Sequence, residues 1–491
     1  MKQDKLFLRF TEIYIIALAV FLLCLPPIEK GYTKFADFKY GAFLLVCGGY
    51  VLCVLLRLAY LWIIGRFSFS FRKFKNLPFC ARMLFVYGGF SFLSVLFSPH
   101  APYAIIGGFR YGGFLSLLIL LCSSFFVFLF YRPKKYHIYI LVGTILCYCS
   151  IGILQLMGKN PLFLYPSYNF YSAVPLHKAV FFSTSGNADH GGAVLSMAIG
   201  LLSGLLLLKK QKLCLVPLFF CLLCSFYLQV DALLVALLGG LFLLLPVVFS
   251  FGILRGVSFY SLFASLCLAC FFFSFSENGM AVTPMPLCFL CFPLLVFGLL
   301  FMSKGSAERI KKRYIIFLSG LFVAGLLCLK FYPFSSPVFL KQAHLLLNGV
   351  WEDSFGSGRF YIWRQSIPFL LSRPFLGIGP DCVGFLPYEP FTTYDAALAK
   401  TFTASITAAH NQYLHIALCQ GFLGLLAYLS LLISTLKKSM GAFSCPHAQM
   451  AAFGVLFYCI QAFFGIDFIS TAPIFWLLVG ISMQSFHVKS T

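Results

Sequence analysis

Long apolar runs, separated by short polar interruptions, cover most of this chain. Many of the runs approach the roughly 20 residues that an α-helix needs to cross the hydrocarbon core of a membrane. They lack the strict alternation of apolar and polar positions that marks the short strands of a membrane β-barrel. The pattern predicts fourteen membrane-spanning helices, at 11–27, 40–64, 80–97, 103–131, 136–157, 188–208, 212–229, 231–250, 257–275, 286–302, 313–330, 411–436, 448–466 and 471–487.

The number of spans depends on how the runs 212–229 and 231–250 are read. Only Gln229 to Asp231 separate them, so they form either two helices or one bent element. We therefore expect an all-α, polytopic transmembrane helical bundle of about 12–14 spans with one large extracytoplasmic loop. The expected division is an N-terminal bundle of about eleven spans at 1–330, a loop with short helices at 331–410, and three C-terminal spans at 411–491.

Composition excludes a soluble domain. Hydrophobic residues make up 61% of the 491 positions and charged residues only 10%, against about 25% in soluble proteins. The 19 cysteines lie mostly inside apolar runs, where cysteine behaves as a small hydrophobe. They lack partners at metal-ligand spacing, so they predict neither a zinc site nor a disulfide framework.

Charge sets the expected orientation of the bundle. If both termini are cytoplasmic, the segments on that side hold most of the 36 lysines and arginines, and the opposite side holds most of the 14 acids. This asymmetry follows the rule that cytoplasmic loops of membrane proteins are basic. The net charge of +22 is therefore an orientation signal, and we expect no nucleic-acid partner.

The residues that could catalyse a reaction or bind a ligand gather between Gly356 and Tyr428. The spacing of apolar residues predicts a short helix over Arg359 to Leu371, and a second helix is expected over Tyr394 to Ala408. Between them, Gly377 and Gly379 permit a tight turn that brings backbone N–H groups close to a ligand. Any chemistry is expected in this outer loop, at the entrance of the span that follows it.

Several segments resemble one family. The segments GRFYIW, PFLGIGPD, HNQYLHIALCQGFLGLLAYL and QAFFGIDFISTAPIFWLLVGIS, which start at 358, 374, 410 and 461, are similar to the C-terminal signature of the O-antigen ligase and polymerase-like (Wzy_C-type) membrane glycosyltransferases. GFRYGGFLSLL from 108 and SGNADHGGAVL from 185 are similar more loosely. The order and spacing of these segments, with a large outer loop before the last three spans, carry the resemblance.

The resemblance implies transfer of a glycan from an undecaprenyl-diphosphate carrier to an acceptor hydroxyl, on lipid A-core or another cell-surface glycan or glycolipid. The reaction would take place on the outer face of the bacterial cytoplasmic (inner) membrane, with membrane lipid around it and with no metal ion, nucleotide sugar or other cofactor. By position, Arg359 is similar to the family arginine that holds the diphosphate. His410 is similar to the histidine that activates the acceptor, and a histidine can accept a proton near neutral pH.

Other residues are candidates for substrate binding. Arg110 falls within the predicted span 103–131, where a charge is costly unless it faces a cavity or a partner, so we assign it as a second diphosphate ligand. The remaining candidates are Trp363, Arg364, Arg373, Gly377, Gly379, Asn411, Asn187 and His190.

Each role has a structural alternative. Arg359 could cap a helix or pair with Glu352 or Asp353, and His410 could be a helix-start residue bonded to its neighbours. Arg110 could reach the membrane surface by extending its side chain. Trp363 could be an interface anchor, and a polar helix entrance explains Asn187 and His190 equally well.

The chain departs from the family pattern at two places. Members often carry an arginine in a Ser-Arg-Gly-like junction where this chain has Gln229 to Asp231. They also often have glutamate where this chain has Gln420. The first departure removes one expected diphosphate contact, which Arg110, Arg364 or Arg373 would have to replace.

Alternatives to a ligase remain open. A repeat-unit polymerase differs only in the acceptor, which the sequence does not reveal. A lipid-linked oligosaccharide flippase would distribute charges along a cavity through many spans, whereas here they concentrate in one loop. A hydrolase with a carboxylate pair drawn from Asp353, Asp381 and Glu389 is weaker, because no spacing fixes such a pair.

Overall fold

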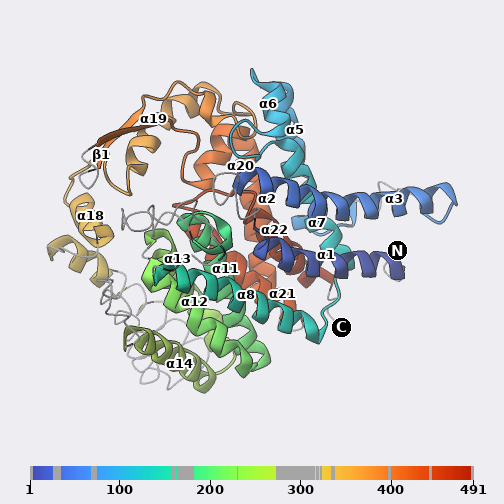
Figure 1. Ribbon diagram of the computed structural model, residues 1–491, viewed down its shortest axis with the longest axis horizontal. Coiled ribbons are helices and arrows are strands. Elements are labelled where there is room, and N and C mark those ends of the chain that lie inside the picture. Colours follow the sequence, from blue (N-terminus) through green and yellow to red (C-terminus); the bar gives the residue numbers. More distant parts are fainter. Residues whose placement is uncertain are drawn as a thin grey trace.

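The computed structural model describes residues 4–25, 35–67, 75–157, 182–228, 230–272, 323–332, 338–395, 400–441 and 445–487, and the single residues 159, 162, 316 and 320. Within these ranges the regular elements are helices and one β-hairpin, and Figure 1 shows the arrangement. The elements are α1 (Lys5–Leu23), α2 (Phe35–Phe43), η2 (Leu44–Gly48), α3 (Gly49–Ile63), α5 (Phe79–Leu96), α6 (Ala101–Ile106), α7 (Phe114–Phe130), α8 (Lys135–Leu156), η4 (Ser183–Ser185), α11 (Ala188–Lys209), η5 (Lys212–Cys214), α12 (Leu215–Leu228), α13 (Asp231–Ser250), α14 (Ile253–Phe272), α18 (Val338–Leu347), α19 (Arg359–Ser372), η7 (Val383–Phe385), β1 (Phe391–Asp395), β2 (Lys400–Ala404), α20 (Gln412–Met440), α21 (Pro446–Gln461), α22 (Ala472–Met483) and η8 (Gln484–His487).

The predicted helical membrane fold is confirmed. Seven helices in the described part of the chain are long and apolar enough to cross a membrane, and four more apolar helices are shorter. The ambiguous pair of runs forms two helices, α12 and α13. The predicted span 286–302 lies outside the described residues, as do 313–315, 317–319, 321 and 322 of the predicted span 313–330.

The prediction of one continuous span over 103–131 is wrong. Helix α6 ends at Ile106, the chain turns through residues 107–113, and α7 begins at Phe114. Gly107 has a φ of 111°, and a Cβ on Gly113 would lie 2.3 Å from the Gly107 nitrogen, so the glycines permit a turn that other residues would not. Arg110 therefore lies in a turn between two helices, and not inside a span as predicted.

The helix predicted over Tyr394 to Ala408 is also wrong. This segment contributes to an antiparallel hairpin in which Phe391 pairs with Ala404 and Asp395 pairs with Lys400. The strands contain mostly threonine and aromatic residues, which favour extended backbone. The large loop thus combines short helices with one hairpin, seen beside α19 in Figure 1.

The C-terminal helices lie in the middle of the bundle. Helix α20 packs on α5, α21 on α11 and α22 on α7. Helices α11 and α21 approach each other closely, so that a Cβ on Gly200 would lie 2.5 Å from the Phe453 carbonyl oxygen and one on Gly204 would lie 2.9 Å from Cα of Met450. Small residues at a helix interface allow this tight packing. The ends of α11, α20 and α21 are thereby brought together at one end of the bundle, where the candidate site lies.

Helix α20 is interrupted at Gly421, which has φ 70° and ψ −178°. The turn after α19 fills the interruption, with Ile378 N–H donating to the Leu418 carbonyl (3.0 Å) and Phe422 N–H donating to the Pro374 carbonyl (2.7 Å). Backbone carbonyls and N–H groups freed by the interruption are thus satisfied by the loop, as an apolar environment requires. This interruption ties the large loop to the bundle.

Replacing Gly421 with alanine is expected to destabilise the protein by roughly 3 kcal/mol or more. The new Cβ would lie 2.1 Å from the Phe375 carbonyl group at a positive φ. Thermal unfolding of the purified protein in detergent measures the effect. Gly89→Ala on α5 is the matched control, because no atom outside its own turn of helix lies within 4 Å of the position that its new Cβ would take. Equal unfolding temperatures for the two variants would contradict the account.

Candidate active site

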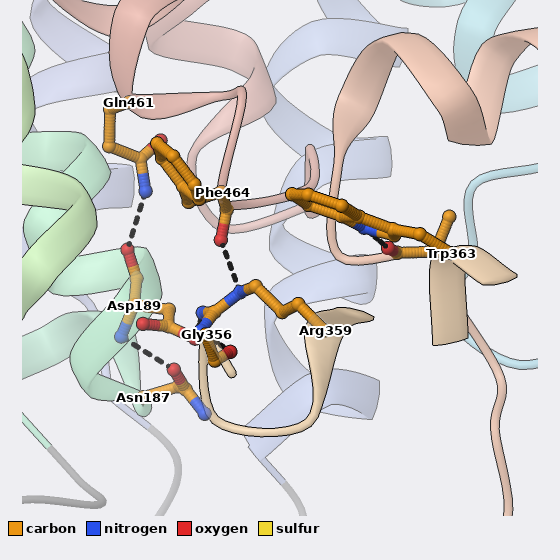
Figure 2. A network of polar contacts seen from close by, with 8 residues as sticks. Asn187, Asp189, Gly356, Arg359, Trp363, Gln461 and Phe464 are labelled. Carbon is orange, nitrogen blue, oxygen red and sulfur yellow. Dashed lines mark hydrogen bonds and ion pairs between the residues drawn. The ribbon is translucent and has the colours of Figure 1, made fainter. Parts of the chain in front are cut away.

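Arg359 is fixed at the start of α19 by a glycine-rich turn. Gly356, Ser357 and Gly358 have positive φ angles of 61°, 58° and 83°, which turn the chain sharply into the helix. The Arg359 guanidinium then donates from Nε to the Phe464 carbonyl (2.9 Å) and from Nη1 to the Gly356 carbonyl (2.8 Å). Figure 2 shows this side chain held between the loop and the segment after α21.

Asp189 is the acidic partner of Arg359. Its Oδ2 lies 3.3 Å from Nη2 of the guanidinium, and the Arg359 side chain is only 14% exposed. Asp189 occupies the first turn of α11, which Asn187 caps by accepting the Asp189 N–H at 2.7 Å. Gln461 donates to the Asp189 carbonyl (3.3 Å), so three helices converge on the ion pair (Figure 2). Asp231, at the start of α13, is close enough to interact electrostatically with Arg359.

Arg110 is held in place through its backbone. The Asp381 carboxylate accepts the N–H groups of Phe109 (3.1 Å), Arg110 (2.8 Å) and Gly112 (3.2 Å), which fixes the turn between α6 and α7. Burial raises the pKa of the Asp381 carboxyl, and these donors and Arg110 oppose that rise. The Arg110 side chain donates from Nη2 to the Thr407 hydroxyl (3.2 Å), and burial lowers its pKa.

His410 lies directly before α20, with a φ of 47° that is uncommon for a residue with a Cβ. The preceding carbonyl, of Ala409, accepts the Trp363 indole N–H at 2.9 Å, which anchors the backbone beside the histidine. The His410 ring forms no hydrogen bond with any residue that the structure describes. Burial, Arg110 and Arg359 lower the pKa of His410 to about 4, so the imidazole is neutral at neutral pH.

Arg110, Arg359 and His410 line one cavity of about 260 Å³. Two cationic side chains and one neutral imidazole therefore face the same space, although they come from three distant parts of the sequence. The other lining residues are Asp189, Ser357, Gly358, Ile362, Ser405, Ile406 and Thr407.

Three predicted asparagine and histidine positions have structural explanations. Asn187 and Asn411 are the N-caps of α11 and α20, with Asn411 Oδ1 accepting the N–H groups of Tyr413 and Leu414 at 3.0 Å each. His190 stacks on Phe468 with ring centroids 4.4 Å apart. None of the three lines the 260 Å³ cavity. They position the helices whose ends form it.

Four other predicted residues lie away from the cavity. Arg364 pairs with Asp353 on the exposed side of α19, and Arg373 is exposed and donates to the Phe97 carbonyl at 3.4 Å. Gly377 and Gly379 have the positive φ values that a tight turn needs, at 66° and 109°. Their N–H groups donate to the carbonyls of Arg373 and Cys419, so the expectation that these groups face a ligand is wrong.

Three residues shape the site in roles that the sequence did not predict, and one of them, Asp381, was expected only as a carboxylate of the weaker hydrolase alternative. Asp189, Asp381 and Thr407 hold Arg359, the Arg110 turn and the Arg110 side chain respectively. The only signal in the sequence was that Asp189 and Asp381 are rare acids in two segments of the resemblance. Their partners are distant in sequence, so only the fold reveals the contacts.

A second, smaller cavity of about 80 Å³ lies on the inner side of Arg110. Four of its polar lining atoms are buried without a hydrogen-bond partner among the described residues: Nε of Arg110, Oγ of Ser116, Nδ1 of His415 and Oε1 of Gln420. A space of this size holds several water molecules, which such atoms would bind.

No cluster of three or more histidine, cysteine or acidic side chains in the described part of the chain could hold a metal ion.

Comparison with known proteins shows the family to which this region of the chain is similar. The model of the family described as O-antigen ligase matches residues 187–429, from the cap of α11 to beyond the interruption of α20. Through these residues, the chain belongs to the O-antigen ligase family. The resemblance seen in the sequence is confirmed, and the matched region includes Asp189, Arg359 and His410. Together with the apolar helices, family membership makes the chain a multi-pass membrane protein.

One characterised protein is a distant relative of this chain. Over 178 residues the chain is 26% identical to the ComP-specific O-oligosaccharyltransferase of Acinetobacter baylyi (strain ATCC 33305 / BD413 / ADP1). The match covers 35% of this chain and 28% of that protein, so the chain aligns with less than a third of the relative's length. This family member is named for oligosaccharide transfer.

Proposed function

We propose that the protein is a membrane glycosyltransferase that moves a glycan from an undecaprenyl-diphosphate carrier to an acceptor hydroxyl. The observation that carries the proposal is the cavity in which Arg110 and Arg359 face the neutral ring of His410, which has no hydrogen-bond partner among the described residues. Two guanidinium groups suit a diphosphate, and a neutral imidazole suits the removal of a proton. Family membership and the oligosaccharide-transferring relative support the same reaction type.

In the proposed reaction, Arg110 and Arg359 bind the diphosphate of the carrier. His410 removes the proton from the acceptor hydroxyl while the acceptor oxygen forms its bond to the anomeric carbon of the glycan. The bond between that carbon and the diphosphate oxygen breaks, and the guanidinium groups stabilise the negative charge that develops on the leaving group. Asp189 holds Arg359 in place before the substrate binds. In this scheme no metal ion or other cofactor takes part, and the rate of transfer should be unchanged by EDTA.

The proposed location is the bacterial cytoplasmic membrane, with both termini cytoplasmic and the cavity at the outer face. The basic residues of the shorter connecting segments support this orientation. The acceptor is proposed to be lipid A-core or another cell-surface glycan or glycolipid, and the name of the relative adds ComP as a further acceptor to test.

Reconstitution in vesicles with a labelled undecaprenyl-diphosphate glycan and candidate acceptors tests the proposal. We expect the label to move to one acceptor, with release of undecaprenyl diphosphate. Growth of the glycan by repeat units on a second carrier molecule would instead identify a polymerase. Movement of the lipid-linked glycan across the membrane without transfer would identify a flippase and contradict the proposal.

The pH profile of transfer is expected to show the low pKa of His410. A base with a pKa of about 4 stays neutral and active as the pH falls below 6.5, so the acidic limb of kcat/KM should lie near pH 4. Arg110→Gln removes a nearby positive charge, which should raise the pKa of His410 and move the limb upward by about one pH unit. Arg364→Gln, on the exposed side of α19, should leave the limb in place. A wild-type limb near pH 6.5, or one that Arg110→Gln does not move, would count against His410 as the base.

A further inference from the structure

The end of the bundle opposite the candidate site contains a groove of about 360 Å³. Its apolar floor comes from α8, α11, α21 and α22, where Leu141, Leu205, Met450 and Leu478 are among the lining residues. Its rim carries Lys134, Lys135 and Lys209. The groove therefore joins a cationic edge to an apolar interior.

The positive charge at this edge extends beyond the groove. A neighbouring cavity of about 240 Å³ shares Ile15, Tyr131, Lys134 and His137 with it and adds three cations, Lys5, Arg9 and Arg132. Glu12 is the one acid that lines either space in the described part of the chain, and it already pairs with Lys134. The edge therefore has an excess of positive charge that its own residues do not neutralise.

Lys135 and Lys209 are available to a ligand. Both side chains are exposed, and neither makes a hydrogen bond or ion pair with a described residue. Lys135 begins the membrane-spanning helix α8, and Lys209 ends α11. The ends of spanning helices lie at the level of the lipid headgroups, so the two ammonium groups stand at that level with the apolar floor beneath them.

We propose that this groove binds an anionic phospholipid of the surrounding membrane, with its phosphate between Lys135 and Lys209 and an acyl chain along the apolar floor. Charge complementarity favours this occupant, because a zwitterionic lipid brings its own positive group to the cationic edge. The apolar floor favours a lipid over a soluble anion, since a free phosphate leaves that surface uncovered. The site is separate from the Arg359 cavity, and the proposal does not depend on the reaction catalysed there.

Native mass spectrometry of the delipidated, full-length protein in detergent tests the proposal with defined lipids. Palmitoyl-oleoyl phosphatidylglycerol should bind at least about tenfold more tightly than the matching phosphatidylcholine. Lys135→Gln combined with Lys209→Gln should weaken phosphatidylglycerol binding by about fivefold for each lysine removed. The matched control is Arg255→Gln combined with Lys437→Gln, which removes two exposed cations at the same end of the bundle without touching the groove.

A second variant tests whether the apolar floor of the groove contributes to lipid binding. Ile138→Trp narrows the groove and leaves all rim charges in place, so it should weaken binding of phosphatidylglycerol although the charge of the protein is unchanged. Equal affinity for the two lipids, or equal affinity of the double lysine variant and its control, would overturn the proposal. Displacement of the lipid by glycerol 3-phosphate at similar concentration would show a site for free phosphate and would also overturn it.

Discussion

Replacing His410 with alanine is expected to reduce the rate of glycan transfer by about 10²- to 10⁴-fold, the usual contribution of a general base. The ring is the neutral proton acceptor that faces the cavity, and both arginines of the cavity act to keep it neutral. Because the ring has no hydrogen-bond partner among the described residues, its removal should leave the fold intact. Initial rates at pH 7 in reconstituted vesicles measure the effect.

The matched control is His137→Ala, which removes a histidine from the opposite end of the bundle. It should retain the wild-type rate within about twofold, because His137 does not line the 260 Å³ cavity. Unfolding temperatures of both variants in detergent would separate loss of chemistry from loss of fold. A His410→Ala enzyme that is well folded and as fast as wild type would rule out the assigned role.

Replacing Arg359 with alanine is expected to reduce transfer by about 10²- to 10³-fold, the loss typical when one group that stabilises developing charge is removed. Lysine at this position keeps a positive charge but loses the planar fork that binds two oxygens, so Arg359→Lys should fall between alanine and wild type. Rates measured over a range of donor concentrations would show whether binding, turnover or both are lost.

Arg359 also has a structural role, which the experiment must separate from its proposed role in binding the diphosphate. Its guanidinium bonds the Gly356 and Phe464 carbonyls and pairs with Asp189. Asp189→Asn breaks the ion pair and keeps the arginine, so it should retain far more activity than Arg359→Ala. Arg364→Ala is the second control, because it removes an arginine five positions along the same helix that faces away from the cavity. Equal losses in Arg359→Ala and Arg364→Ala would contradict the proposed site.

The helices of this fold could be predicted from the sequence because a membrane restricts the chain to long apolar segments. The turn at 107–113 was missed because its glycines lie within an apolar run and its stabilising contact, Asp381, is far away in sequence. The hairpin was missed because short polar segments carry little periodic signal and are decided by tertiary contacts.

The candidate site was predictable only in part, because many of its contacts join residues that are distant in sequence. Arg359 and His410 stand out as polar residues in the large loop, whereas Asp189 is one residue at the entrance of an apolar helix until the fold places it 3.3 Å from Arg359. Arg110 was predicted to bind the diphosphate because it was expected inside a span. It lies instead in the turn between α6 and α7, and the fold still places it on the cavity. Arg364 and Arg373 could not be separated from it by sequence, because their direction depends on the packing of α19.

The most direct measurement is the structure of the protein with undecaprenyl diphosphate bound, determined by electron cryomicroscopy in a lipid nanodisc. The account predicts the diphosphate in the 260 Å³ cavity, in contact with the guanidinium groups of Arg110 and Arg359 and within reach of the His410 ring. A diphosphate bound elsewhere on the protein, with this cavity unoccupied, would contradict it.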